Sequence, residues 1–337
     1  MDVLRGLATL LEAGVPLPRA LDEAESGSTG PNRAALAQIR AGIERGDSFA
    51  GALAAIPGWA TGFEIALIQA GERSGDLAGA IGRVADQAER ERELKSTLAT
   101  AAIYPAVLAV VGGLSVLVML LFVVPRFADL FGGAGATLPA STALLLSLSA
   151  FPGDHAFALV LGLVGVTIGV AAIGGSVGGR ELASRVVLAA PGLSRIRRTQ
   201  LGARYARLAG TLLAGGAPIG AALRHVAESF GDPTARREAE RVAEAVREGS
   251  TLTSALAGSS VFAGTIARMA ALGEETGRLA TLLERAADSQ ESALRRDLDR
   301  LTKLFEPAMT VFFGLVIGLI AVALLQAVYG VNAGAFG

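Results

Sequence analysis

Three long stretches of the sequence carry no charged side chain, and they restrict the fold more than any other feature. They cover residues 97–124, 156–179 and 307–337, and the apolar part of the third is 311–328. A helix needs about 20 mostly apolar residues to cross a hydrocarbon core about 30 Å thick. Because lipid offers the backbone no hydrogen-bond partners, such a segment has to be a helix or part of a closed barrel. We therefore expect three transmembrane helices.

The composition agrees with this expectation. Hydrophobic residues make up 52% of the chain, charged residues only 18%, and the mean hydropathy is +0.50; soluble domains have about 25% charged residues. A fourth apolar segment, residues 141–151, is roughly half as long as a span. Pro139 and Pro152 bound it, and we interpret it as a short interfacial or loop helix.

The basic residues predict the orientation of the spans. Of the 30 Lys and Arg residues, ten lie in 1–124 and nineteen in 175–305, while the loop after the first span holds only Arg126. Segments rich in Lys and Arg stay in the cytoplasm. We therefore expect 1–124 and 175–305 to lie on the cytoplasmic side, with the loop 126–155 and the C-terminal tail outside.

An internal repeat with an offset of 202 residues organises the chain. Repeats of this kind reveal duplicated structural units. The matching blocks are Gly14-Val15-Pro16-Leu17 with Gly216-Ala217-Pro218-Ile219, Gly71-Glu72-Arg73-Ser74-Gly75 with Gly273-Glu274-Glu275-Thr276-Gly277, and Tyr104-Pro105-Ala106 with Glu306-Pro307-Ala308.

The pattern within the first copy is helical, and no strand pattern occurs in it. Gly14 and Pro16 close the first helix, Ser48 caps the short fourth, and the sixth continues into a span that Pro105, like Pro307 in the second copy, enters with a kink. The expected helices cover 3–13, 18–26, 33–45, a short segment after Ser48, 61–69, and a sixth starting near Asp76.

The expected fold class is an all-α integral membrane protein with two repeated cytoplasmic six-helix bundles and three transmembrane helices. The expected order is a first cytoplasmic domain (1–100), span one (101–125), a periplasmic loop (126–155), span two (156–179), a second cytoplasmic domain (180–305), span three (306–329) and a short periplasmic tail (330–337).

The most interesting polar features are the two Gly-Glu-x-Ser/Thr-Gly turns. The candidate interaction residues are Gly71, Glu72, Ser74, Gly75, Gly273, Glu274, Thr276 and Gly277. One interpretation is structural: the glycines allow a tight turn, Ser74 or Thr276 caps the helix that follows, and the glutamate lies near its positive end. The other is that Glu72 and Glu274 contact a partner or help bind a hard cation such as calcium, although one carboxylate per turn is too few for a cage.

The chain offers no recognisable catalytic or cofactor site. It has no cysteine, no G-x-x-x-x-G-K-[ST] phosphate loop, and only two histidines, His155 and His225. We expect no catalytic residue, no metal and no cofactor. The mixed Glu and Arg stretches are typical of solvated helix faces, and no basic run interleaved with aromatics points to nucleic acid. Inside the spans, Gly165 with Gly169 and Gly314 with Gly318 have the spacing of close helix packing.

These repeated motifs resemble the type II secretion system F domain family, which includes the general secretion pathway F protein and the type IV pilus assembly platform protein PilC. The resemblance extends from Leu7 to Val328. It implies an inner-membrane platform protein that couples a cytoplasmic assembly ATPase to the growth of a pseudopilus, in contact with pseudopilins or pilins, other inner-membrane components and further copies of itself. Family members usually carry an additional N-terminal segment, whereas this chain starts almost at the first helix.

Several alternatives stay open. The main interpretation is type II secretion; a type IV pilus or competence apparatus is the alternative that the same resemblance allows. A transporter subunit is more remote, because transporters normally need ionisable residues within their spans and these spans have none. A membrane-bound enzyme would need motifs that the sequence lacks.

Overall fold

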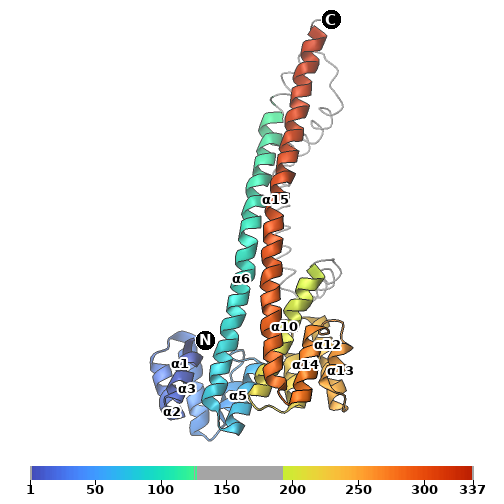
Figure 1. Ribbon diagram of the computed structural model, residues 1–337. Coiled ribbons are helices and arrows are strands. Elements are labelled where there is room, and N and C mark those ends of the chain that lie inside the picture. Colours follow the sequence, from blue (N-terminus) through green and yellow to red (C-terminus); the bar gives the residue numbers. More distant parts are fainter. Residues whose placement is uncertain (1, 125, 127–192, 336–337) are drawn as a thin grey trace. The chain divides into compact units, whose positions relative to one another are not determined.

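The computed structural model describes residues 2–124, 126 and 193–335 of the chain, and in these residues every regular element is a helix (Figure 1). The expected middle span at 156–179, with Gly165 and Gly169, and the expected short helix at 141–151 lie outside the described residues. The absence of strands from the described part agrees with the all-α expectation.

Six helices form the first group, and a π-helical turn, η1 (Met119–Val123), follows them. Two expected boundaries were wrong: the third helix begins earlier, at Gly30, and the fifth continues through Ser74, so that Gly71–Ser74 are helical. The helices are α1 (Asp2–Glu12), α2 (Leu17–Ser26), α3 (Gly30–Glu44), α4 (Phe49–Ala54), α5 (Gly62–Ser74) and α6 (Leu77–Val118).

Six described helices also form the second group. They are α10 (Leu193–Ala214), α11 (Ile219–Glu228), α12 (Pro233–Arg247), α13 (Leu252–Ala257), α14 (Thr265–Thr276) and α15 (Leu279–Ala335). Three of them have the same lengths as their counterparts: α11 and α2 have 10 residues, α12 and α3 have 15, and α13 and α4 have 6. The order of the helices therefore follows the repeat in the sequence.

Local capping explains where several helices begin. The Ser48 hydroxyl accepts a hydrogen bond from the Gly51 N–H, as expected, and Thr251 accepts one from the Ser254 N–H in the second group. Thr61 and Glu64 form a capping box at the start of α5. Such caps satisfy backbone donors that have no partner inside the helix.

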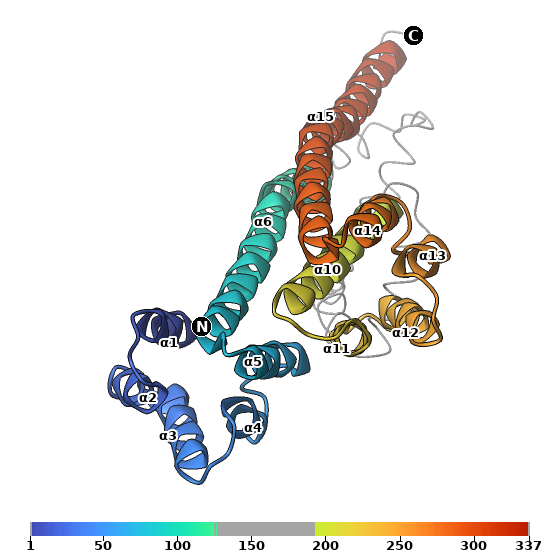
Figure 2. The ribbon, with the colours of Figure 1, turned by 60° about the horizontal axis from the view of Figure 1, so that its bottom comes forward.

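The chain divides into two compact units, which we name the bundle unit (Met1–Ser96 and Arg180–Asp297) and the apolar unit (Thr97–Gly179 and Leu298–Gly337). Both helical groups contribute to the core of the bundle unit, in which α5 packs beside α10 and α11 (Figure 2). Its largest fully buried side chains include Leu7, Leu21, Leu36, Ile39, Phe49, Leu53, Leu67, Tyr205, Leu208 and Phe262. Burial raises the pKa of the Tyr205 hydroxyl, and the ring of Tyr205 stacks on that of Phe262 at a centroid distance of 4.5 Å.

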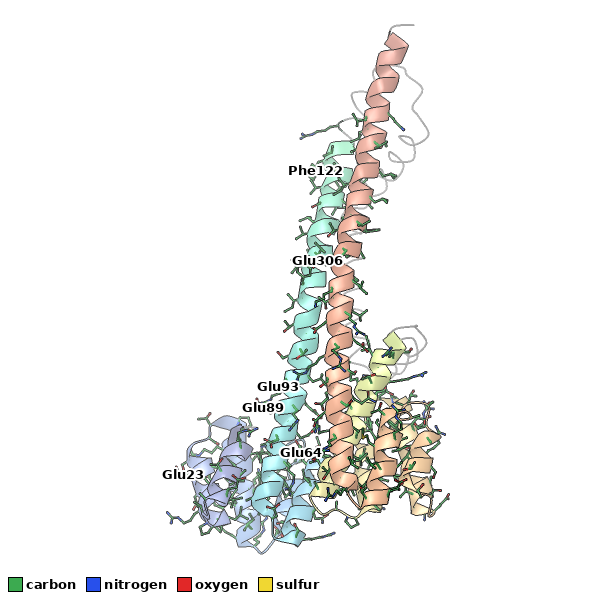
Figure 3. All side chains as sticks on the ribbon, in the orientation of Figure 1. Glu23, Glu64, Glu89, Glu93, Phe122 and Glu306 are labelled. Atoms are coloured by element: carbon green, nitrogen blue, oxygen red, sulfur yellow. The ribbon has the colours of Figure 1, made fainter. Side chains whose placement is uncertain are left out.

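The described part of the apolar unit contains two helical segments that are long and apolar enough to cross a membrane. The residues Ala106–Val123 have a mean hydropathy of 2.8, and a window within Leu279–Gln326 reaches 2.7. Large apolar side chains on both segments are exposed; they include Phe122, which Figure 3 labels, at 59% and Leu315 at 65%. Exposed apolar surface of this extent needs a lipid or protein partner.

The two apolar helices contact each other, and one of the contacts joins positions that the repeat relates. The Tyr104 hydroxyl donates a hydrogen bond to Glu306 at 3.1 Å, and these residues are 202 positions apart. A Cβ on Gly112 would collide with the ring of Phe313. Both α6 and α15 continue as helices through Pro105 and Pro307; the expected kinks at these prolines stay a prediction.

Candidate functional site

Gly75 and Gly277 end α5 and α14 in the left-handed conformation, with φ of 77° and 68°. The Asp76 N–H donates to the Gly71 carbonyl at 2.9 Å, and the Arg278 N–H donates to the Gly273 carbonyl at 3.0 Å. This is the Schellman arrangement that a glycine after a helix favours. Gly14 and Gly216 end α1 and α10 in the same way, two positions before Pro16 and Pro218 at the starts of α2 and α11.

The first glycine of each motif has a different role, because it lies inside the helix and is buried. A Cβ on Gly71 would collide with the side chain of Ala80 and lie 2.8 Å from the Asp76 carbonyl oxygen; on Gly273 it would lie 2.8 Å from the Leu279 Cα. Each motif therefore needs its first glycine for the close approach of the next helix and its last glycine for the turn.

The glutamate of each motif binds the N-terminus of a helix, but not the helix that follows the motif. The Phe49 and Ala50 N–H groups of α4 donate to the Glu72 carboxylate at 2.5 and 3.1 Å. The Leu252 and Thr253 N–H groups of α13 donate to Glu274 at 2.7 and 3.2 Å. These donors belong to the first turn, where a helix has unpaired N–H groups and partial positive charge. Each glutamate therefore connects two consecutive helices through residues 22 positions apart in sequence.

The expected capping role of Ser74 and Thr276 was wrong. Their hydroxyls donate backwards, to the carbonyls of Gly71 and Leu272, at 3.2 and 2.6 Å. At the start of α6 it is Asp76 that accepts a hydrogen bond from the Gly79 N–H, at 3.0 Å. A hydroxyl within the last turn points back toward its own helix, so it does not reach the next one.

The hydrogen bonds of Glu72 and Glu274 are relevant to the expectation that these glutamates contact a partner or help bind a cation. Both oxygens of Glu72 and of Glu274 accept hydrogen bonds from the neighbouring helix. In the part of the chain that the structure describes, no three His, Cys, Asp or Glu side chains gather in a metal-binding group. A direct role of either glutamate in binding a partner stays a prediction.

The expected membrane-packing role of Gly314 and Gly318 also stays a prediction. Among the described residues, apart from the chain neighbours and the nearby backbone of the same helix, no atom lies within 4 Å of a Cβ built on either glycine. The first pair of this kind, Gly165 and Gly169, lies outside the described residues.

One repeated ion-pair cluster did not emerge from the sequence. Arg5 on α1 pairs with Asp86 and Glu89 of α6, at 3.0 and 3.6 Å. In the second group, Arg207 on α10 pairs with Asp288 and Glu291 of α15. All three residues recur at the offset of 202, and this shared offset is the signal that could have revealed the cluster.

The two clusters differ in burial. The side chain of Arg5 is 50% exposed and that of Arg207 only 8%. Burial disfavours the charged form of Arg207, yet its hydrogen bonds and ion pairs with Asp288 and Glu291 raise its pKa above the ordinary value. Arg207 is therefore a buried charge that depends on its partners.

We expect Arg207→Ala to lower the free energy of unfolding by about 2 kcal/mol, because it removes a buried cation that pairs with both Asp288 and Glu291 at a partly covered site. Arg5→Ala, the matched control, should cost less than about 1 kcal/mol, as exposed ion pairs do. Thermal unfolding of the two detergent-solubilised variants measures the difference. Equal losses would show that burial does not distinguish the two clusters.

These features describe a class of protein: a chain whose described elements are all helices, two of them long and apolar enough to cross a membrane, and in which one Gly-Glu-x-Ser/Thr-Gly motif between two helices occurs twice. The chain belongs to the type II secretion system protein F family. The family model described as "Type II secretion system (T2SS), protein F" matches residues 3–125 and 205–326. The two matched segments contain the two copies of each motif.

Relatives from two kinds of machine are similar to this chain over most of its length. The type 4 fimbrial assembly protein PilC of Pseudomonas putida is 34% identical and covers 96% of this chain and 82% of the relative. The type II secretion system protein F of Pseudomonas aeruginosa is 32% identical, with 98% and 82% covered. The type IV pilus assembly protein PilC of Thermus thermophilus is 30% identical, with 94% and 78% covered. The resemblance noted from the motifs is thereby confirmed.

Proposed function

We propose that this chain is the inner-membrane platform protein of a type II secretion system, which couples a cytoplasmic assembly ATPase to the growth of a pseudopilus. The observation that carries the proposal is the match of the family to both halves of the chain. The same role in a type IV pilus or competence apparatus is the second candidate, because relatives named for pilus assembly are as similar to the chain as those named for secretion.

The finer arrangement is part of the proposal. Two copies of one six-helix domain, within 1–100 and 180–305, are carried by three spans at 101–125, 156–179 and 306–329. The repeated contacts of Glu72 and Glu274 and of Arg5 and Arg207 support two copies of one domain. The middle span that this requires, at 156–179, lies outside the described residues, and its support is the uncharged stretch in the sequence.

We also propose that both domains face the cytoplasm from a bacterial inner membrane. The distribution of Lys and Arg supports this orientation, since all but Arg126 lie on one side of the three spans. The domains would then be accessible to the assembly ATPase, while the spans would be accessible to pseudopilins or pilins and to other inner-membrane components.

The test is the turnover of the cognate assembly ATPase with and without this chain in lipid nanodiscs. The chain alone should hydrolyse no nucleotide, because its sequence has no phosphate-binding loop. Addition of the chain should raise the turnover of the ATPase several-fold over empty nanodiscs. Intrinsic hydrolysis that survives purification, or an ATPase that does not respond, would contradict the proposal.

A further inference from the structure

Within the bundle unit, the two helical groups meet through two different faces. Helix α5 of the first group packs against α10 and α11 of the second (Figure 2). A cavity of about 200 Å³ lies at this contact, and its lining includes Ala66, Ala70 and Arg73 of α5 together with Pro218 and His225. The contact made by α5 is thus heterologous: one group uses its fifth helix, and the other uses its first and second. Ion pairs of α6 with α10 and α15 form a separate contact between the groups.

The two contacting helices run in opposite directions. A second cavity is lined by Thr61 and Glu64, at the start of α5, and by Glu228 and Ser229, at and just after the end of α11. The start of α5 therefore lies near the end of α11. All six residues Ala66, Ala70, Arg73, Pro218, Ala221 and His225 line the first cavity. From the antiparallel order we infer a register with Ala66 toward His225, Ala70 toward Ala221, and Arg73 toward Pro218.

Each group also has the face that the other uses, and there the counterpart residues are exposed. Ala70 is 9% exposed, but its counterpart Leu272 on α14 is 46% exposed, an unusual position for a large apolar side chain outside the apolar unit. Gly215, which packs against Leu67, is buried, whereas its counterpart Ala13 is exposed. A heterologous contact between two repeats leaves one face of each kind unused.

We name the two unused faces the α14 face (Arg268, Leu272 and Glu275) and the α2 face (Pro16, Arg19 and Glu23). We propose that the α14 face of one copy of the chain binds the α2 face of a second copy, so that the contact between α5 and α11 within each chain is repeated between chains.

The charges on the two faces favour this occupant. The offset of 202 places Arg268 where Ala66 lies and Glu23 where His225 lies, so that opposite charges face each other in the same register. Glu23 is exposed on α2, where Figure 3 labels it. Leu272 takes the place of Ala70 and meets the aliphatic stem of Arg19, which can cover apolar surface. We would not expect the surface of an unrelated partner to complement both the α14 face and the α2 face.

Because the α14 face and the α2 face are different surfaces, each copy binds one neighbour through its α14 face and another through its α2 face, in a head-to-tail arrangement. It joins successive copies into a ring where the rotation closes, or into an open array where it does not. The proposal concerns the contact between copies and does not depend on the machine to which the chain belongs.

The sequence contains no cysteine, so any disulfide between two copies must form between the introduced cysteines. Two differently tagged copies of the full chain are co-expressed, one carrying Leu272→Cys and the other Arg19→Cys, and membranes are oxidised. We expect one disulfide-linked dimer that carries both tags. Its yield should exceed by about tenfold that with Ala34→Cys, at an exposed site on α3, in place of Arg19→Cys. Ala70→Cys with Ala221→Cys in one chain is the positive control for the contact within the chain.

A charge swap tests the register. Arg268→Glu in the first copy should lower the yield of the mixed dimer about fivefold, and Glu23→Arg in the second copy should restore it. Dimers formed by Leu272→Cys alone would show a symmetric contact and overturn the proposal. So would a yield no higher than that with Ala34→Cys, or crosslinks only to another protein. Failure of the crosslink while the chain still raises ATPase turnover would overturn this inference and leave the proposed function intact.

Discussion

Gly71→Val should destabilise the bundle unit by about 3 kcal/mol or more, because the added side chain forces apart helices that touch across the motif. The Cβ alone would collide with Ala80 and with the backbone at Asp76. For a unit of this size, the melting temperature should fall by roughly 6–12 °C. The single tryptophan, Trp59, lies close in sequence to the start of α5 and provides the fluorescence signal.

Gly6→Ala is the matched control. Gly6 is also a helical glycine, in α1, but in the described part of the chain no atom outside the neighbouring residues and backbone of α1 itself lies within 4 Å of the place where its Cβ would be. Alanine there should leave the free energy of unfolding unchanged or raise it by about 0.5–1 kcal/mol, because alanine restricts the conformations of the unfolded chain. Similar melting temperatures for Gly71→Val and the unchanged chain would show that close packing is not the reason for this glycine.

Glu72→Gln and Glu274→Gln should each lower the free energy of unfolding by about 1–2 kcal/mol, since each removes the charge from two hydrogen bonds with a helix N-terminus. This exceeds the roughly 0.5 kcal/mol expected if the glutamate merely lay near a helix end. The two sites share no partner, so the double variant should lose about 2–4 kcal/mol. We expect each single variant to support export or piliation and the double variant to be impaired.

Export measured against the amount of protein in the membrane distinguishes the two roles of these glutamates. If they tie helices together, export by the double variant should fall together with its melting temperature and its abundance. Loss of export at normal abundance and normal melting temperature would indicate a contact with a partner. Normal export at normal abundance would remove both residues from the functional set. Glu12→Gln, at an exposed site on α1, is the control.

The sequence predicted the elements that depend on local signals. Ser48 as a cap, Gly14 with Pro16 as a helix boundary, and the helical entry into the first apolar segment were all confirmed. These features follow from residue types within a few positions, where backbone geometry and capping act. The repeat located the motifs of the second group for the same reason, because both copies carry the same local signals.

The contacts that the sequence did not predict are tertiary. Nothing in the local pattern around Glu72 indicates that its partner helix begins 23 residues earlier. Ser74 and Asp76 are both good capping residues, and only the path of the turn decides which one reaches α6. Arg5 and Arg207 occupy equivalent positions, so their difference in burial comes from tertiary packing. Beside Arg207, Arg90 and Glu91 of α6 pair with Asp288 and Arg204, and no pattern within either copy contains these contacts.

The central claim is that one chain presents two copies of a domain on the cytoplasmic side of a membrane, and single-cysteine labelling tests it most directly. Cysteines replace Ser26, Leu138, Ser250 and Ala333, one at a time, in the otherwise cysteine-free chain. In intact cells, after the outer membrane is permeabilised, an impermeant maleimide should label the variants at Leu138 and Ala333. It should label those at Ser26 and Ser250 only once the inner membrane is opened. Protection of Leu138, or labelling of Ser250 from outside, would contradict the arrangement of three spans with two cytoplasmic domains.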